Sequence, residues 1–233
     1  ASGEVIDLPE AAFRHLVQVL RMQAGDALIV FDGRGGEYEA TLESVAKRGA
    51  TLRIGSFHDV SRESALDLTL VQGISKGDRM DFTIQKAVEL GVTRIVPITT
   101  ERCNVNLGAE RQDKKFEHWR GVLRSACEQS GRTRVPELCA VQRFTDWLAQ
   151  PVTGARLMLD PQGAIPLAGV QGPVEGMSLV VGPEGGLSPA ELRIGAAEGC
   201  LGVRLGPRVL RTETAGVVAL SVLQALFGDL RHE

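Results

Sequence analysis

Gly182-Pro183-Glu184-Gly185-Gly186 and Gly206-Pro207-Arg208-Val209-Leu210-Arg211-Thr212 are the two stretches of this sequence that decide the fold. The first follows the apolar run 179–181 and the second follows Val203-Arg204-Leu205, and each precedes a segment with helical character. Glycines at the carboxyl end of a strand let a ligand approach the backbone, and open α/β sheets bind their ligands at that end. The pattern predicts two adjacent strand-to-helix corners that form one pocket.

The pocket is predicted to suit a flat, neutral ligand better than a phosphate. The chain has neither the G-x-x-x-x-G-K-[ST] loop nor a G-x-G-x-x-G stretch after a strand, so the P-loop and dinucleotide-binding classes are disfavoured. Backbone donors and acceptors flanked by Leu205, Val209 and Leu210 fit an adenine and an apolar thioether. Two ordinary tight turns are the alternative.

Outward from the corners, strands and helices alternate from residue 66 onward. Strands are predicted at 66–72, 94–98, 137–141, 155–159, 177–181 and 202–205, and helices at 78–90, 110–129, 144–149, 189–198 and 213–227. Ser188-Pro189-Ala190-Glu191 predicts a capping box, and Gly91 and Gly199 stand where left-handed helix caps belong. This alternation predicts an α/β fold with a mostly parallel sheet covered on both faces.

The first part of the chain has a different predicted pattern of secondary structure. Helical spacing runs from Leu8 to Leu20, and strands are predicted at 27–32, 37–45 and 51–57, with a turn at 33–36. Short antiparallel strands in so few residues indicate a small barrel. Because residues 58–64 are polar, we expect two domains, 1–64 and 65–233.

Composition is that of an ordinary globular chain, with 43% hydrophobic and 24% charged residues and a net charge of −3. Residues 101–134 carry 8 Lys and Arg against 5 Asp and Glu. Such a local basic patch suits a selective RNA site, although a solvated helix face is the alternative. The four cysteines form no C-x-x-C pair, and the chain begins without a secretory leader. We therefore expect a cytoplasmic protein without a metal site or membrane span.

The paired corners resemble the cofactor motifs of the SPOUT (trefoil-knot) methyltransferases. They are most similar to the RsmE family, which methylates N3 of a uridine in small-subunit (16S) ribosomal RNA. The likeness covers nearly the whole chain and extends to residues 19–21, 31–33, 73–81, 85–92 and 126–132. One departure is Cys103, where a serine is expected, and the two side chains are close in size.

The resemblance implies a deep trefoil knot in the C-terminal domain, an N-terminal PUA-like RNA-binding β-barrel and a homodimer. Pattern reasoning alone predicts an unknotted sheet. The implied cofactor is S-adenosylmethionine (SAM), bound at the corners. The cofactor-binding residues are expected to be Leu159, Val181, Gly182, Pro183, Glu184, Gly185, Gly186, Leu205, Gly206, Val209, Leu210, Thr212 and Ala215.

Methyl transfer from a sulfonium is a direct displacement, so alignment of the reacting atoms supplies most of the rate. Uridine N3 carries a proton, and its methylation needs a base or a cation that stabilises the anion. Arg211, inside the second corner, is a candidate for holding the uridine oxygens. In the basic segment, Glu128 and Arg132 could act on the target base. Candidate RNA contacts are Arg21, Arg34, Lys76, Arg102 and Gln129, with surface charge as the alternative.

Two other functions remain open at this stage. A related enzyme could use the same pocket to methylate a ribose 2′-OH or another base position. A non-enzymatic RNA-binding assembly factor could retain a vestigial pocket, although the intact pair of corners disfavours it. A nucleotide-dependent α/β enzyme is disfavoured by the missing phosphate loops.

Overall fold

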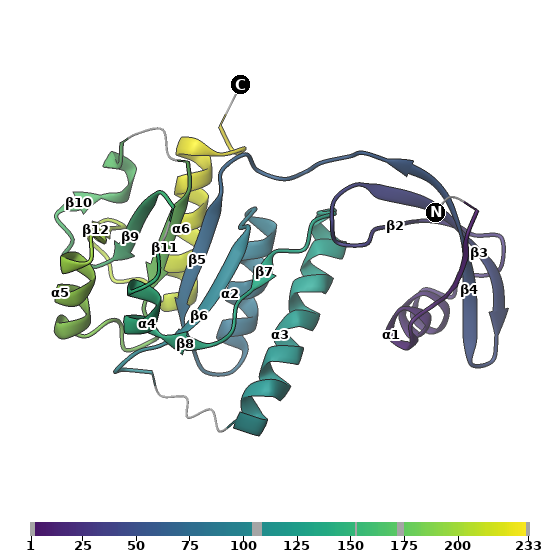
Figure 1. Ribbon diagram of the computed structural model, residues 1–233, viewed down its shortest axis with the longest axis horizontal. Helices are drawn as coiled ribbons and strands as arrows, with labels where there is room; N and C mark the ends of the chain where they lie inside the picture. Colours follow the sequence, from purple (N-terminus) through teal and green to yellow (C-terminus); the bar gives the residue numbers. More distant parts are fainter. Residues whose placement is uncertain (1–2, 104–108, 152, 172–174, 232–233) are drawn as a thin grey trace. The chain divides into compact units, whose positions relative to one another are not determined.

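The computed structural model describes residues 3–103, 109–151, 153–171 and 175–231. The chain forms two compact units (Figure 1). The N-terminal unit consists of Ala1–Arg62 together with Gly131–Arg134, and the C-terminal unit consists of Glu63–Ser130 and Val135–Glu233. The sequence pattern assigns Gly131–Arg134 to the second domain by prediction, whereas in the structure these residues pack with the first unit.

The N-terminal unit is an antiparallel sheet in the order β1-β4-β3-β2. Its strands are β1 (Val5–Asp7), β2 (Ala27–Val30), β3 (Glu37–Ala46) and β4 (Gly49–His58). The helix expected over residues 8–20 forms as α1 (Glu10–Phe13), which continues into the π-helix η1 (Arg14–Val19). Phe13 packs with Leu42 and Leu52 in the core of this unit. The predicted small antiparallel β domain is confirmed, and β1 is an addition that the sequence pattern did not indicate.

The C-terminal unit is built on a parallel sheet in the order β10-β12-β9-β11-β5-β6-β7, with β8 also pairing to β6. Its strands are β5 (Leu68–Gly73), β6 (Arg94–Thr99), β7 (Glu137–Leu138), β8 (Gln142–Arg143), β9 (Ala155–Leu159), β10 (Ile165–Pro166), β11 (Met177–Val181) and β12 (Leu201–Arg204). Every residue of β5 and β11 is buried, as expected for central strands covered on both faces.

Helices cover both faces of this sheet (Figure 1). They are α2 (Asp78–Glu89), α3 (Ala109–Ser130), α4 (Phe144–Leu148), α5 (Pro189–Ala197) and α6 (Thr212–Phe227), together with the short 3₁₀ helix η2 (Leu167–Gly169). On one face Phe144 and Trp147 pack against Val71 and Val180 of the central strands. On the other face α2 packs against α3 and α6. The predicted α/β class and all five predicted helices are confirmed.

One predicted strand differs in the structure. Of the strand expected over 137–141 only β7 forms, and β8 follows this range; the two short strands pair with opposite ends of β6. Pro97 lies between the two pairings. Its backbone nitrogen faces the same side of β6 as the Ile95 carbonyl, which accepts a hydrogen bond from the Cys139 N–H. Because proline has no N–H to donate, the ladder is interrupted at this point.

The order of strands in the sheet differs from their order along the chain. β11 inserts between β5 and β9, and β12 inserts between β9 and β10. The two strands that lead into the glycine-proline corners are therefore not neighbours, contrary to the expectation of adjacent corners, because β9 lies between them. The parallel arrangement still brings the carboxyl ends of all three strands to one edge of the sheet.

Candidate functional site

The first corner, residues 182–186, connects β11 to the start of α5. The Gly186 N–H donates to the Pro183 carbonyl at 2.8 Å, and Gly186 has a φ of +68° that favours glycine. A Cβ atom at Gly182 would lie 2.8 Å from the Gly186 carbonyl carbon and from the Leu187 nitrogen. A side chain at residue 182 would therefore force this tight turn open.

Contacts from other elements hold the first corner in place. The predicted capping box is present, since Ser188 Oγ accepts from the Glu191 N–H at 3.1 Å and Glu191 Oε2 accepts from the Ser188 N–H at 2.8 Å. The Arg102 Nη1 atom donates to the Gly185 carbonyl at 2.9 Å and to the Leu187 carbonyl at 3.4 Å. Arg102, in the segment that follows β6, thus supports the first corner by donating to backbone carbonyls in and directly after that corner.

The second corner, residues 205–211, connects β12 to α6. Gly206 has a φ of +96°, and the Ala215 N–H donates to the Arg211 carbonyl at 2.7 Å where the helix begins. Val209 is 82% exposed, which is unusual for a valine and leaves an apolar side chain available to a ligand at this corner.

The two corners and the end of β9 surround one cavity of about 520 Å³. Its lining residues are Arg79, Arg102, Leu159, Pro161, Val181, Gly182, Pro183, Glu184, Gly185, Gly186, Leu187, Leu192, Val209, Leu210, Arg211, Thr212, Glu213 and Ala215. The volume is in the range of small-molecule sites, and an apolar lining with a few polar groups is typical of them. All of the predicted cofactor residues line the cavity except Leu205 and Gly206.

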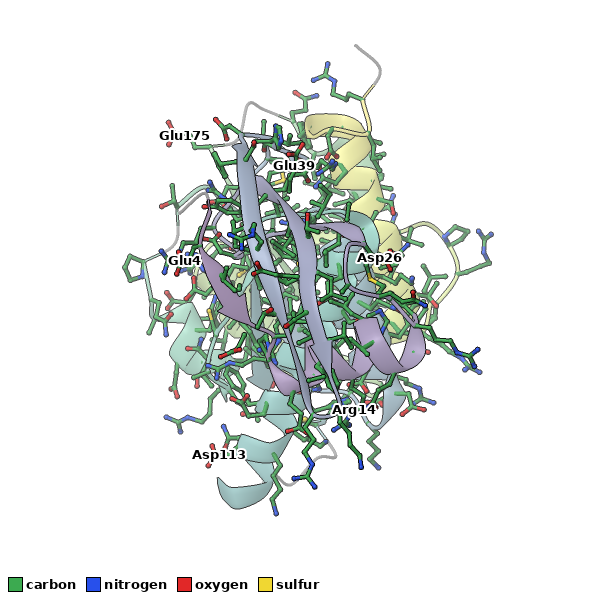
Figure 2. The ribbon with its side chains drawn as sticks, turned by 90° about the vertical axis from the view of Figure 1, so that its right-hand side faces the viewer. Glu4, Arg14, Asp26, Glu39, Asp113 and Glu175 are labelled. Atoms are coloured by element: carbon green, nitrogen blue, oxygen red, sulfur yellow. The ribbon has the colours of Figure 1, made fainter. Side chains whose placement is uncertain are left out.

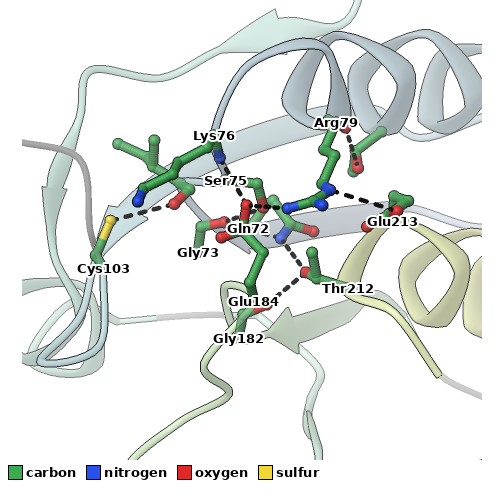
Figure 3. A network of polar contacts seen from close by, with 12 residues as sticks. Gln72, Gly73, Ser75, Lys76, Arg79, Cys103, Gly182, Glu184, Thr212 and Glu213 are labelled. Carbon is green, nitrogen blue, oxygen red and sulfur yellow. Dashed lines mark hydrogen bonds and ion pairs between the residues drawn. The ribbon is translucent and has the colours of Figure 1, made fainter. Parts of the chain in front are cut away.

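A buried chain of hydrogen bonds ties the two corners to the centre of the sheet (Figure 3). The Thr212 hydroxyl donates to the Gly182 carbonyl at 2.6 Å, and the Gln72 Nε2 atom donates to the Thr212 hydroxyl at 3.1 Å and to the Gly73 carbonyl at 2.9 Å. Gln72 is fully buried in β5. Because buried polar groups are costly when unpaired, this chain favours one fixed spacing of the corners.

Arg79, in the first turn of α2, also contacts both corners (Figure 3). Its Nη1 atom lies 3.0 Å from Glu184 Oε1, and its Nε atom lies 3.7 Å from Glu213 Oε1. The Lys76 N–H donates to the same Glu184 oxygen at 2.8 Å. Arg79 is not among the site residues predicted from the sequence, although its place just after β5 puts it at the carboxyl edge of the sheet with the corners.

The carboxyl group of Glu184 has a shifted pKa. Burial acts to raise this pKa, but hydrogen bonds from the N–H groups of Lys76 and Glu184 and from the Arg79 guanidinium outweigh burial, and the pKa lies below its usual value. Glu184 is therefore a carboxylate near neutral pH. It lines the cavity as a negative charge that is already neutralised by its neighbours.

The three predicted catalytic residues lie in different parts of the chain. Arg211 is exposed and lines the cavity. Glu128 is exposed near the carboxyl end of α3, as is Gln129. Arg132 is only 4% exposed and belongs to the N-terminal unit. Of the three, the structure brings only Arg211 to the cavity within the C-terminal unit.

The predicted RNA contacts are divided between the units. Lys76 and Arg102 are exposed at the corner edge of the C-terminal sheet. Arg21 and Arg34 are exposed on the N-terminal unit, and Arg21 has a φ of +58°. Glu4, Arg14, Asp26 and Glu39 also lie on the surface of the N-terminal unit (Figure 2). That surface therefore carries charges of both signs.

Within residues 3–103, 109–151, 153–171 and 175–231, no group of His, Cys, Asp and Glu side chains is arranged to hold a metal ion. None of the helices in the same ranges is both long enough and apolar enough to cross a membrane.

Comparison with family models matches both parts of the chain. Residues 62–224 match the model described as an RNA methyltransferase domain. Residues 8–55 match the model described as an RNA methyltransferase PUA domain. A ribosomal RNA small subunit methyltransferase E of Bacillus subtilis is 34% identical, with 90% of this chain and 85% of the relative covered. The chain belongs to the ribosomal RNA small subunit methyltransferase E family.

Other members of the ribosomal RNA small subunit methyltransferase E family cover the chain almost completely. The protein of that name from Buchnera aphidicola (subspecies Schizaphis graminum) is 32% identical over 98% of this chain and 93% of its own length. The crystal structure of the family member from Neisseria gonorrhoeae bound to SAM is 39% identical, with a TM-score of 0.94, and covers 99% of this chain and 95% of its own.

A second solved structure also contains the cofactor. A Legionella pneumophila protein in complex with bound SAM is 41% identical, with a TM-score of 0.91, and covers 98% of this chain and 94% of its own. Membership of the ribosomal RNA small subunit methyltransferase E family accounts for a PUA domain that precedes the methyltransferase domain in the sequence. The predicted family and cofactor are confirmed by these comparisons.

Proposed function

We propose that this protein transfers the methyl group of SAM to N3 of a uridine in the 16S RNA of the small ribosomal subunit. The observation that carries the proposal is the single cavity enclosed by both glycine-proline corners and the end of β9. Family relatives are named as methyltransferases of small-subunit ribosomal RNA, and two similar structures contain SAM. The uridine N3 acceptor rests on the sequence resemblance.

The cavity residues fit SAM on chemical grounds. Leu159, Val181 and Leu210 provide apolar surface for an adenine and a thioether, and the glycines of the first corner leave backbone groups open to polar edges. SAM supplies an electrophilic methyl group on a sulfonium sulfur. We assign the cofactor contacts to Leu159, Val181, Gly182, Pro183, Glu184, Gly185, Gly186, Leu205, Gly206, Val209, Leu210, Thr212 and Ala215.

Arg211 is assigned to the acceptor side of the cavity. Arg211 is exposed and lines the cavity, and the planar pair of N–H groups of its guanidinium can hold a uridine oxygen or a phosphate. A fixed positive charge at the uridine O4 or O2 would stabilise the anion that remains when N3 loses its proton. Glu128 and Arg132 are assigned to the target base. Arg21, Arg34, Lys76, Arg102 and Gln129 are assigned to the RNA strand.

Four further properties belong to this proposal. We expect a homodimer located in the cytoplasm. We expect the chain to pass from the first domain to the second between residues 64 and 65, with Gly131–Arg134 returning to the first unit. We also expect the C-terminal unit to be threaded as a trefoil knot, and the insertion of β11 and β12 between earlier strands supports that threading.

The test is methylation of small-subunit RNA that lacks this modification. The purified protein and SAM are incubated with naked 16S RNA and, in parallel, with assembled small subunits. The modified nucleotide is then mapped by mass spectrometry of nuclease fragments. A single 3-methyluridine supports the proposal. A ribose methylation or another methylated base instead supports the related-enzyme alternative, and SAM binding that never yields methylated RNA contradicts the proposed activity.

A further inference from the structure

Arg79 connects three segments that are distant in sequence. It lies in the first turn of α2, Glu184 lies in the first corner, and Glu213 lies in the first turn of α6 directly after the second corner. Arg79 contacts Glu184 at 3.0 Å and Glu213 at 3.7 Å (Figure 3), and all three residues line the cavity. One guanidinium therefore spans the gap between the two corners.

The two carboxylates differ in how much they depend on Arg79. Glu184 Oε1 also accepts a hydrogen bond from the Lys76 N–H at 2.8 Å. Glu213 is only 16% exposed, and its Oε2 atom is buried with no hydrogen-bond partner among the described residues. A largely buried carboxylate needs a nearby cation, because desolvation disfavours its charged form. Arg79 is the cation that the structure places beside Glu213.

Arginine has the geometry that this bridge requires. Its guanidinium is planar, and its Nε and Nη1 atoms donate in different directions from one rigid group. Here Nη1 faces the Glu184 carboxylate and Nε faces the Glu213 carboxylate. A lysine carries a single charged nitrogen and cannot reproduce both contacts with the same spacing. Without a cation between them, two carboxylates on one rim would repel each other.

We infer that Arg79 is a positioning residue that fixes the separation of the two corners and thereby sets the affinity of the cavity for SAM. The inference rests on the proposed function, since it concerns the same cavity. Arg79 acts on the cofactor through Glu184 and Glu213, and it does so from the rim. Its side chain is 44% exposed, so the Arg79–Glu184 pair contributes little to the stability of the fold. Loss of the cation beside the largely buried Glu213 costs stability as well, so the positioning role is tested by SAM affinity in variants that are still folded, including one in which Glu213 is also neutralised.

The experiment measures SAM binding by titration calorimetry, and unfolding by denaturant, for the full chain and its variants. Arg79→Gln should weaken SAM binding about tenfold, because small displacements of binding groups have large effects on a preorganised site. Its unfolding midpoint should fall below that of the control, because Glu213 loses its cation, and SAM binding is therefore measured where every variant is folded. Arg79→Lys should recover only part of the affinity, because one nitrogen reaches one carboxylate at a time.

The matched control is Arg94→Gln. Arg94 is 49% exposed and forms a 2.8 Å ion pair with Glu137, so it resembles Arg79 in its own exposure, while its partner carboxylate is 60% exposed. It begins β6, at the edge of the sheet opposite the corners. Arg94→Gln should keep wild-type SAM affinity.

A double-mutant cycle tests the pairing itself. If Arg79 acts through Glu213, the loss of affinity in the double variant Arg79→Gln and Glu213→Gln should be smaller than the sum of the single losses. Additive losses, or wild-type SAM affinity in Arg79→Gln, would overturn the inference and leave the proposed function intact. Full recovery by Arg79→Lys would also overturn it. Absence of SAM binding by the wild-type chain would overturn both.

Discussion

Replacing Thr212 by valine tests whether the corners are tied to the sheet as described. The two side chains have the same shape, so the change removes a hydroxyl and leaves the packing volume nearly unaltered. Thr212 is 7% exposed, and its hydroxyl is the group that links Gln72 to the Gly182 carbonyl. In Thr212→Val the Gly182 carbonyl loses this donor, whereas Gln72 Nε2 keeps its bond to Gly73.

The expected loss of stability follows from that unpaired group. A buried polar group left without its partner costs about 1–3 kcal/mol, so we expect the free energy of unfolding to fall by about 2 kcal/mol. For a protein of this size, that corresponds to a decrease in Tm of about 4–8 °C. SAM affinity should also fall, because the first corner is no longer held to the start of α6.

Fluorescence of the two tryptophans is a suitable assay. Trp119 and Trp147 both lie in the C-terminal unit and are 2% and 3% exposed, so their emission reports on this unit. Thr214→Val is the matched control, since Thr214 is exposed on the same helix and its replacement should change stability by less than about 0.5 kcal/mol. Equal stability of the two variants would refute the proposed tie. A destabilised Thr212→Val that keeps wild-type SAM affinity would show that the tie does not govern the cavity.

Three more predictions concern the same cavity. Gly185→Val places a Cβ atom 3.0 Å from the Arg102 Cβ and should weaken SAM binding at least tenfold in calorimetry while the far-UV circular dichroism spectrum stays unchanged; wild-type affinity would exclude the first corner as the pocket. Arg211→Ala should lower kcat about 100-fold with little change in SAM Kd, and equal losses in both would contradict an acceptor-side role. The pKa of Glu184 is lowered by folding, so its contribution to stability is present at neutral pH and is lost as the pH falls below about 4.3. The difference in unfolding free energy between wild type and Glu184→Gln should therefore shrink in acid; a difference independent of pH would refute this assignment.

The sequence predicted the local features of the site because they depend on neighbouring residues. Glycine and proline after an apolar run predict a corner at residues 182–186, and serine followed by glutamate predicts the capping box of α5. Helix periodicity likewise identified α2 and α6. These patterns arise within a few residues, where backbone geometry and capping decide the conformation.

The remaining features depend on which strands are neighbours. Arg79 and Glu184 are 105 residues apart, and no local pattern indicates that they meet. The insertion of β12 between β9 and β10 also has no local signature, so the sequence suggested neighbouring corners where the structure places β9 between them. Arg102, chosen as an RNA contact for its charge, has a guanidinium nitrogen that donates to the carbonyls of Gly185 and Leu187.

The return of Gly131–Arg134 to the N-terminal unit has a consequence for biosynthesis. The Gly35 N–H donates to the Thr133 carbonyl at 3.2 Å, and Arg62 Nη1 donates to the Gly131 carbonyl at 3.1 Å. A nascent chain therefore cannot complete this unit until the segment after α3 has left the ribosome, although domains are often finished in the order of synthesis. A fragment that ends at residue 64 would therefore lack the last structural piece of the N-terminal unit.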